Sequence, residues 1–284
     1  MIYRNPNMFY FIPELDKKEC IIFDLETSGL NPKEDRIIQI AAIKIRKERE
    51  ELKEIDRLNV YISPDFLITP KIEKLTGITN QFLKKERKEE DVFSQIFNFF
   101  GNVPLCCGYN INFDIGFMKE LYHRHNEIFI CPIALDILSM ARDFIPYKDI
   151  KSYKLGKVIE FYGLHEDLTF HNAMDDVIGT YRLLKIFIKK YKEEYSLPLG
   201  HLQPKIFNFF TWQGKRHDLA RIYFCTNIGN IYYDIYHYCW GAKEINMEDI
   251  NLPYLAKQVY QISHTETDDE LYYWAKKQIK SASS

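Results

Sequence analysis

Four acidic residues and one histidine have types and positions that could support chemistry. Asp24 and Glu26 lie two residues apart at the end of the apolar run Cys20–Glu26. Because side chains alternate across a strand, both carboxylates project from one face. Two like charges near a core repel each other and are costly to desolvate, and a bound cation resolves both problems. The D-x-E pair alone is common, so a surface pair is the alternative.

Two further carboxylates occupy helical faces that are otherwise apolar. Asp114 shares its face with Phe117, Met118 and Leu121. The alternative for Asp114 is a favourable helix-dipole interaction in the first turn. The second carboxylate is Asp176, for which the alternative is a buried acid capped by an arginine or a backbone amide. On a helix from Asn172, Asp176 shares the core-facing stripe of Ala173, Val177, Thr180, Leu184 and Phe187, whereas Asp175 points away.

These four acids indicate hard divalent cations with oxygen ligands. Mg²⁺ or Mn²⁺ fits such a set, whereas zinc would prefer histidine or cysteine. Two ions ~3.5–4 Å apart can hold the attacking and leaving oxygens of a phosphodiester in line. The reaction also needs a base to take a proton from water. His171 immediately precedes the helix that carries Asp176, and an ordinary imidazole with a pKa near ~6.5 can accept that proton.

The elements that must position these residues begin with three strands joined by short connections. Apolar, β-rich runs at Cys20–Glu26, Arg36–Arg46 and Arg57–Ser63 predict an antiparallel meander. The nearly all-charged stretch Lys47–Asp56 predicts a solvated hairpin tip between the last two strands.

The apolar pattern then changes to a helical period, interrupted by one short strand. Leu105–Tyr109 is expected to be a buried strand. Strands followed by strand–helix alternation predict an α/β layer fold with a mixed sheet. Helices are expected over Asp91–Phe100, Asp114–His125, Ala134–Phe144, Tyr153–Phe161 and Asn172–Lys190.

The C-terminal part is expected to be a small α+β domain, 205–284, joined to domain 1–195 by the linker 196–204. Three tryptophans with Lys215, Arg216 and Arg221 nearby could stack bases and hold phosphates of a single strand. A small core that needs large side chains is the interpretation we favour. The expected elements are a hairpin of Ala220–Thr226 and Ile231–Tyr238 around Asn227–Asn230, and helices at Ile250–Ile262 and Asp268–Lys280.

Composition limits the classes of partner. The 284 residues contain 38 basic and 40 acidic side chains, a net charge of −2. A nucleic acid would therefore be held by a local groove or by metal ions rather than by bulk charge. Six cysteines without a C-x-x-C pair predict reduced thiols. No run approaches the ~18 apolar residues of a membrane span, so we expect no membrane association and a cytoplasmic location.

Three motifs resemble those of a known family. Asp24–Leu30 (DLETSGL) resembles D-x-E-T-[TS]-G-L, Tyr109–Asp114 (YNINFD) resembles [HY]-N-x-x-F-D, and His171–Asp176 (HNAMDD) matches H-x-A-x-x-D. In this order they resemble the DnaQ-like 3′–5′ exonucleases of the DEDD superfamily, histidine subgroup, which includes exonuclease domains of the DNA polymerase III epsilon type. The resemblance covers about residues 18–192.

This resemblance implies an α/β, ribonuclease-H-like fold with a mixed five-stranded sheet and flanking helices. It implies two Mg²⁺ or Mn²⁺ ions carried by Asp24, Glu26, Asp114 and Asp176, with His171 activating the attacking water. Nucleoside 5′-monophosphates would leave from a 3′ end. Ordinary packing is the alternative for Leu30 and Phe113. The implied substrate contacts are Thr27, Gly29, Leu30, Asn110 and Phe113.

The leading interpretation is a metal-dependent 3′–5′ exonuclease of proofreading or repair type, acting on single-stranded or frayed DNA 3′ ends. An exoribonuclease that trims RNA 3′ ends or short oligoribonucleotides is the alternative, because nothing in the motifs decides whether a 2′-hydroxyl is tolerated. A non-catalytic nucleic-acid-binding module is more remote, because no ligand is lost. Residues 205–284 could bind a polymerase or a repair partner. They look folded, unlike the flexible tether of proofreading subunits.

Overall fold

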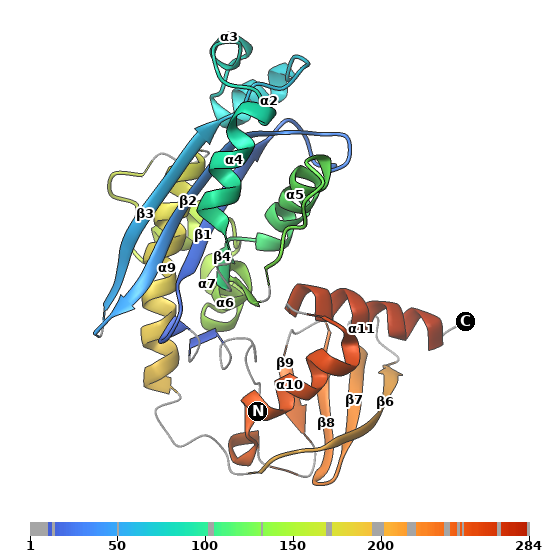
Figure 1. Ribbon diagram of the computed structural model, residues 1–284. Helices are drawn as coiled ribbons and strands as arrows, with labels where there is room; N and C mark the ends of the chain where they lie inside the picture. The colour runs from blue at the N-terminus through green and yellow to red at the C-terminus, as the bar shows by residue number, and fades with distance from the viewer. Residues whose placement is uncertain are drawn as a thin grey trace. The chain divides into compact units, whose positions relative to one another are not determined.

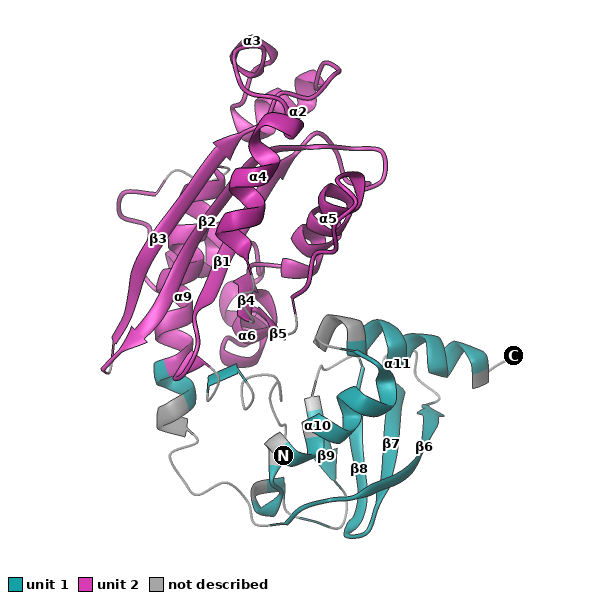
Figure 2. Cartoon of the chain, in the orientation of Figure 1, with its two compact units in different colours: residues 1–13, 189–284 teal, residues 14–188 magenta. Residues whose placement is uncertain are grey.

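The computed structural model contains two compact units, Glu14–Ile188 and a second unit formed by Met1–Pro13 with Lys189–Ser284 (Figures 1 and 2). Residues 195–201, which include most of the expected linker, lie outside the described residues. The structure describes residues 11–12, 15–49, 51–101, 105–131, 133–168, 172–194, 202–214, 220–235, 239–242, 245, 247–265 and 268–282.

The first unit is built on a five-stranded mixed sheet, as predicted. Its strand order is β3-β2-β1-β4-β5. β1 pairs antiparallel with β2 and parallel with β4, which in turn pairs parallel with β5. The carboxyl ends of β1, β4 and β5 therefore share one edge, the usual place for a ligand site in such sheets. The strands are β1 (Cys20–Thr27), β2 (Ile37–Glu48), β3 (Glu51–Tyr61), β4 (Leu105–Gly108) and β5 (Ile133–Asp136).

The charged stretch Lys47–Asp56 contains the turn of the β2–β3 hairpin and is mostly exposed, as the predicted solvated hairpin tip requires, but most of it is strand. β2 continues to Glu48 and β3 begins at Glu51, with Arg49 in a left-handed conformation at the turn (φ 57°). β3 is an edge strand with most of its side chains in solvent, where charges are tolerated and discourage edge pairing. Exposed ion pairs here are Arg46–Glu48 (3.3 Å), Lys53–Glu48 (3.2 Å) and Arg57–Glu54 (2.7 Å).

The helices flank this sheet on both faces: α4 crosses in front and α9 lies behind (Figure 1). The prediction of a helix over Ala134–Phe144 was wrong at its start. Parallel pairing with β4 makes Ile133–Asp136 a strand, and the Asp136 carboxylate then caps the helix that follows. The helices are α2 (Pro70–Thr76), α3 (Asn80–Leu83), α4 (Glu89–Phe100), α5 (Ile111–Arg124), α6 (Ile137–Phe144), α7 (Tyr147–Ile150), α8 (Leu155–Phe161) and α9 (Ala173–Glu194).

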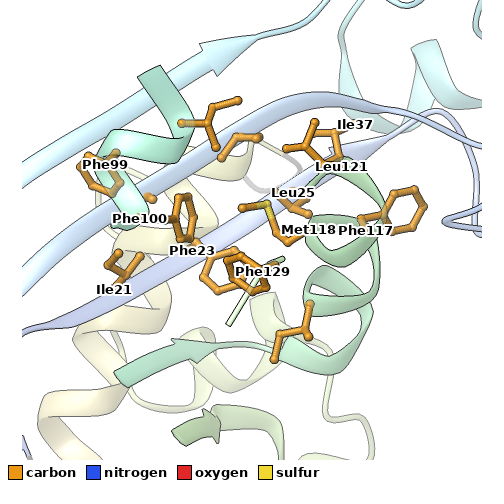
Figure 3. Packing of buried hydrophobic residues seen from close by; sticks show 14 of the residues in the cluster. Ile21, Phe23, Leu25, Ile37, Phe99, Phe100, Phe117, Met118, Leu121 and Phe129 are labelled. Carbon is orange, nitrogen blue, oxygen red and sulfur yellow. The ribbon is translucent and has the colours of Figure 1, made fainter. Parts of the chain in front are cut away.

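The main core lies between the sheet and helices α4 and α5 (Figure 3). Phe23 and Leu25 of β1 point into it, and the Phe23 ring meets Phe100 edge-on at a centroid distance of 5.3 Å. Because side chains alternate along β1, Asp24 and Glu26 project from the opposite face. This core thereby fixes the strand that carries the first two candidate ligands.

The second unit contains a four-stranded antiparallel sheet with two helices, the small α+β region that was predicted. Its strand order is β6-β7-β8-β9. The hairpin of β7 and β8 and both helices were predicted, whereas β6 and β9 were not. No described helix is long and apolar enough to cross a membrane. The elements are β6 (Ile206–Gln213), β7 (Ala220–Thr226), β8 (Gly229–Asp234), β9 (Cys239–Ala242), the 3₁₀ turn η1 (Met247–Asp249), α10 (Leu252–Ser263) and α11 (Asp268–Ala282).

Candidate active site

Three of the predicted carboxylates converge at one point. Asp24 and Glu26 stand near the carboxyl end of β1, and Asp176 lies in the first turn of α9. One carboxylate oxygen from each residue lies within 4.8 Å of the other two. All three side chains are partly buried. A strand and a helix far apart in the sequence therefore form one acidic cluster, as the alternation along β1 and the stripe on α9 predicted.

The fourth acid, Asp114, connects helix α5 to β1. Its side chain is only 3% exposed, and its Oδ1 accepts a hydrogen bond of 3.1 Å from the backbone N–H of Leu25. β4 pairs with β1 only over Cys20–Ile22, because the chain then turns into α5 at Asn110 (φ 60°). The Asp114 carboxylate thus takes the place of a strand partner and holds the segment between Asp24 and Glu26.

The electrostatics of the cluster disfavour four simultaneous negative charges. Burial raises the pKa of Asp24 well above its usual range, and the charges of Asp114, Asp176 and Glu26 raise it further. Burial and then Asp176 raise the pKa of Glu26 to about 8. Burial also raises the pKa of Asp114, although the Leu25 N–H opposes this shift by stabilising the carboxylate.

No lysine or arginine within the described part of the chain forms an ion pair with Asp24, Glu26 or Asp114. These three carboxylates must therefore hold protons or bind cations. Oxygen ligands of this kind suit a hard divalent ion.

The start of α9 explains how a charged residue reaches the cluster. The Asn172 side-chain oxygen accepts a hydrogen bond from the Met174 N–H (3.0 Å), and the Asn172 carbonyl accepts from the Asp176 N–H (3.0 Å). The positive end of the helix dipole favours a carboxylate in this first turn. The rest of the predicted stripe is buried, namely Ala173, Val177, Thr180, Leu184 and Phe187.

The loop after β1 brings three predicted substrate contacts together. The Thr27 hydroxyl donates to the Gly29 carbonyl (2.6 Å), and Leu30 beside it is 83% exposed. Asp35 braces this loop by accepting from the Ser28 hydroxyl (3.3 Å) and the Asn31 N–H (2.9 Å). A side chain at position 29 would begin only 2.3 Å from the Asp35 carboxylate, so any residue other than glycine would displace that carboxylate.

The other two predicted contacts lie at the start of α5. Asn110 is exposed, and its backbone N–H donates to Asp136 Oδ1 (2.8 Å). Phe113 is partly buried, and its ring packs against Phe117 at a centroid distance of 5.0 Å. Packing therefore accounts for part of the Phe113 ring, and a role for either residue in substrate binding stays a prediction.

Three residues near the site were missed by sequence reasoning. Asp136 fixes the turn at Asn110 and caps α6, and its signal was an acid directly after the apolar run Ile133–Leu135. Gln39 pairs with both Glu26 and Tyr61, so these three residues form one row across β1, β2 and β3. Burial raises the pKa of Tyr61, and the negative charges of Glu86, Glu26 and Asp175 raise it further. Asp175 is partly buried, as Asp176 is, but it is not among the three clustered acids, so the expectation that it points away stays a prediction.

The predicted base, His171, lies outside the described residues. Its assignment rests on the H-x-A-x-x-D motif and stays a prediction. Asn172, the next residue, stands at the start of α9.

The sequence profile of a family described as Exonuclease (RNase_T) matches residues 21–184, more than half of the chain. The chain belongs to this exonuclease family. The family resemblance drawn from the three motifs is thus confirmed, as is the expectation of an enzyme of the exonuclease class. The matched segment contains β1, α5 and the first turn of α9, which carry the four acids.

Curated relatives of this exonuclease-family chain include much longer polymerases. It is 31% identical over 177 residues to a PolC-type DNA polymerase III of Pediococcus pentosaceus, an alignment covering 62% of this chain and 12% of the relative. It is 29% identical over 230 residues to the PolC-type DNA polymerase III of Streptococcus thermophilus, an alignment covering 81% of this chain and 15% of the relative. The chain thus spans less than a sixth of the length of these relatives.

Solved structures share the fold of this exonuclease-family chain. Escherichia coli exonuclease I in complex with a dT13 oligonucleotide is similar with a TM-score of 0.51 and 23% identity, over 63% of this chain and 42% of that one. Exonuclease I from Methylocaldum szegediense gives a TM-score of 0.51 and 21% identity, over 77% of this chain and 54% of that one. The ribonuclease-H-like exonuclease fold predicted from the sequence is confirmed.

Proposed function

We propose that this chain is a metal-dependent 3′–5′ exonuclease that releases nucleoside 5′-monophosphates from single-stranded or frayed DNA 3′ ends. The observation that carries the proposal is the convergence of Asp24, Glu26 and Asp176 within 4.8 Å, with buried Asp114 beside them. A DNA substrate is supported by the relatives, which are DNA polymerases, and by exonuclease I, which was solved with a dT13 oligonucleotide.

The four carboxylates fit two Mg²⁺ or Mn²⁺ ions. They supply only oxygen ligands, and positive charge among them would remove the electrostatic penalty that now raises the pKa values of Asp24 and Glu26. After burial, the charges of Asp114, Asp176 and Glu26 all raise the pKa of Asp24, so this carboxylate would be among those that hold the ions. When bound, such ions neutralise phosphate charge and align the attacking and leaving oxygens.

The chain's own residues would supply the remaining steps. His171 would take the proton from the attacking water, as a general base adjoining the helix of Asp176. The loop braced by Asp35 would grip the terminal nucleotide through Thr27 and Gly29. Leu30 offers an apolar side chain to the last base, since it is 83% exposed in the folded chain.

A matched pair of variants tests the proposal. We expect the wild-type chain with Mg²⁺ to shorten a 5′-labelled DNA strand from its free 3′ end and to release 5′-mononucleotides. Asp176→Asn should lower the rate at least ~10³-fold, because it removes a ligand from the cluster. Asp175→Asn is the control. It removes the same charge from the neighbouring residue, which is not part of the three-acid cluster, and should change the rate only a few-fold.

Equal rates in wild type and Asp176→Asn would refute the assignment of the site. A strand with a blocked 3′ end should resist digestion, and its digestion would refute the 3′–5′ direction. A matched RNA strand, digested in parallel, tests the sugar preference. Faster cleavage of RNA than of DNA would replace the proposal with an exoribonuclease.

A further inference from the structure

The sheet of the second unit has one face covered by helices and one face lined by rings. Register assigns the side chains, because directly paired residues project from the same face. Phe209 and Phe224 face the helices, and the Phe209 ring lies 5.1 Å from that of Trp274 on α11. The opposite face carries Phe210 paired with Tyr223, Tyr223 paired with Tyr232, and Trp212 paired with Arg221. We call Phe210, Trp212, Arg221, Tyr223 and Tyr232 the aromatic face.

The rings of the aromatic face present flat surfaces. Phe210 stacks on Tyr223 with a centroid distance of 5.0 Å and an interplanar angle of 5°, and is still 45% exposed. Trp212 is 42% exposed on the same edge strand. The Tyr232 ring extends over Gly241 of β9, where any side chain would begin 2.5 Å from the phenol. Large exposed rings at neighbouring positions on a sheet are costly unless something binds them.

The one cation of this face lies among the rings and is paired with a buried carboxylate. The Arg221 guanidinium lies 4.3 Å from the Tyr232 ring centroid and 5.8 Å from that of Trp212, so the cation sits between two rings. Asp234 is the one carboxylate of the four strands, and it is buried beneath Arg221 with Oδ2 2.9 Å from Nε. The strands therefore expose rings and part of one guanidinium, and the carboxylate paired with it is buried, out of reach of a phosphate.

Rings that stack bases, together with a cation for the backbone, are the combination that binds single-stranded nucleic acid without sequence preference. We propose that the aromatic face binds single-stranded nucleic acid by stacking bases on Phe210 and Trp212, with Arg221 beside the phosphates. This inference rests on the proposed function, because it gives the exonuclease a second hold on the strand that it digests. A strand held at two places binds more tightly than at either alone, through the effective concentration that the connection creates.

The test measures binding of the full chain to a 5′-fluorescein dT20 strand by anisotropy, in EDTA so that no cleavage occurs. Replacing Phe210 and Trp212 together by leucine keeps apolar volume but removes the stacking surfaces, and should raise Kd at least about tenfold. Replacing both by tyrosine restores flat rings and should keep Kd within a few-fold of wild type. Tyr273→Leu on α11 is the control, a more exposed ring (66%) on the helix that covers the other face. Circular dichroism checks that each variant is folded.

An unchanged Kd in the double leucine variant overturns the proposal. The proposal is also overturned if light scattering shows that the wild type is a dimer and the double leucine variant a monomer, with the same Kd for dT20. The aromatic face would then bind a second copy of the chain. The two proposals fail separately. If the chain releases mononucleotides but the double leucine variant has an unchanged Kd, the exonuclease proposal stands and the aromatic-face proposal is refuted. If binding depends on the rings but no mononucleotide is released, the aromatic-face proposal stands and the exonuclease proposal is refuted.

Discussion

Without a divalent cation, the acidic cluster should make the stability of the first unit depend on pH. Burial and Asp176 raise the pKa of Glu26 from 4.5 to about 8. The folded chain therefore keeps a proton that the unfolded chain releases, so the free energy of unfolding falls as pH rises from about 4.5 to about 8. This stability is fully present below the lower value and lost above the higher one.

The size of the effect follows from the same pKa values. At about 1.4 kcal/mol for each pKa unit, a rise from 4.5 to about 8 sets a ceiling of about 5 kcal/mol. Glu26 is partly exposed and solvent screens part of its charge, so we expect a loss of about 2–3 kcal/mol between pH 5 and pH 8. For a unit of this size that corresponds to a fall in Tm of about 4–12 °C.

The assay is thermal unfolding in EDTA at pH 5 and pH 8, followed by circular dichroism and by tryptophan fluorescence. All three tryptophans, Trp212, Trp240 and Trp274, belong to the second unit. Circular dichroism should therefore show the pH-dependent fall in Tm, whereas the fluorescence transition should show little of it. Glu26→Gln should remove the part of the pH dependence that Glu26 carries and stabilise the chain at pH 8, while Asp24 and Asp114, whose pKa values burial also raises, keep the rest. Adding Mg²⁺ at pH 8 should raise Tm in wild type more than in the variant.

A Tm of the first unit that is the same at pH 5 and pH 8 in EDTA would contradict the electrostatic account of the cluster. So would a pH dependence that survives unchanged in Glu26→Gln, because another group would then carry it. A shift of equal size in the tryptophan signal would place the titrating group in the second unit.

The remaining predictions concern the base, the loop and the core. Wild-type activity should rise about tenfold per pH unit on the acid side as His171 deprotonates. The rate of His171→Ala should be at least ~10²-fold lower, and its pH–rate profile should lack this acid-side rise. Gly29→Ala should raise KM and lower Tm because its Cβ would lie 2.3 Å from Asp35; adding Asp35→Ala should recover part of the Tm, and no recovery would refute the steric explanation. Leu121→Ala should cost about 2–5 kcal/mol in denaturant unfolding, because it empties a buried position between α5 and the sheet; a cost below about 1 kcal/mol would contradict that packing.

Local sequence patterns predicted those helices and strands whose apolar residues fit only one kind of secondary structure. β4 and α9 appeared where the sequence placed them, because a short buried run and a long amphipathic stripe each have one interpretation. β5 could not be found this way. Ile133–Leu135 is too short to separate a strand from the first turn of a helix, and its pairing with β4 decides the matter. The strand content of the charged stretch Lys47–Asp56 was missed for a related reason, since an edge strand in solvent accepts the residues of a loop.

The candidate site divides in the same way. Alternation brought Asp24 and Glu26 to one face, and the α9 stripe directed Asp176 inward, so local periodicity predicted the cluster. The row of Gln39 and Tyr61 beside Glu26 needs the register of three strands, which no local pattern encodes. The aromatic face needs register as well. Trp240, which sequence reasoning grouped with Trp212, is buried against Phe224 at a centroid distance of 5.5 Å and belongs to the core.

One strand, β1, supplies both the core and the site, and this links stability to function. Phe23 and Leu25 pack under α4 and α5, while Asp24 and Glu26 between and beside them face the acidic cluster. A shift of one residue in the pairing with β2 would bury two carboxylates in the apolar core and expose two apolar side chains at the site. The packing of Phe23 and Leu25 is therefore what holds the carboxylates in place against their mutual repulsion, and the fold can keep an acidic cluster because the opposite face of the same strand is so fully buried.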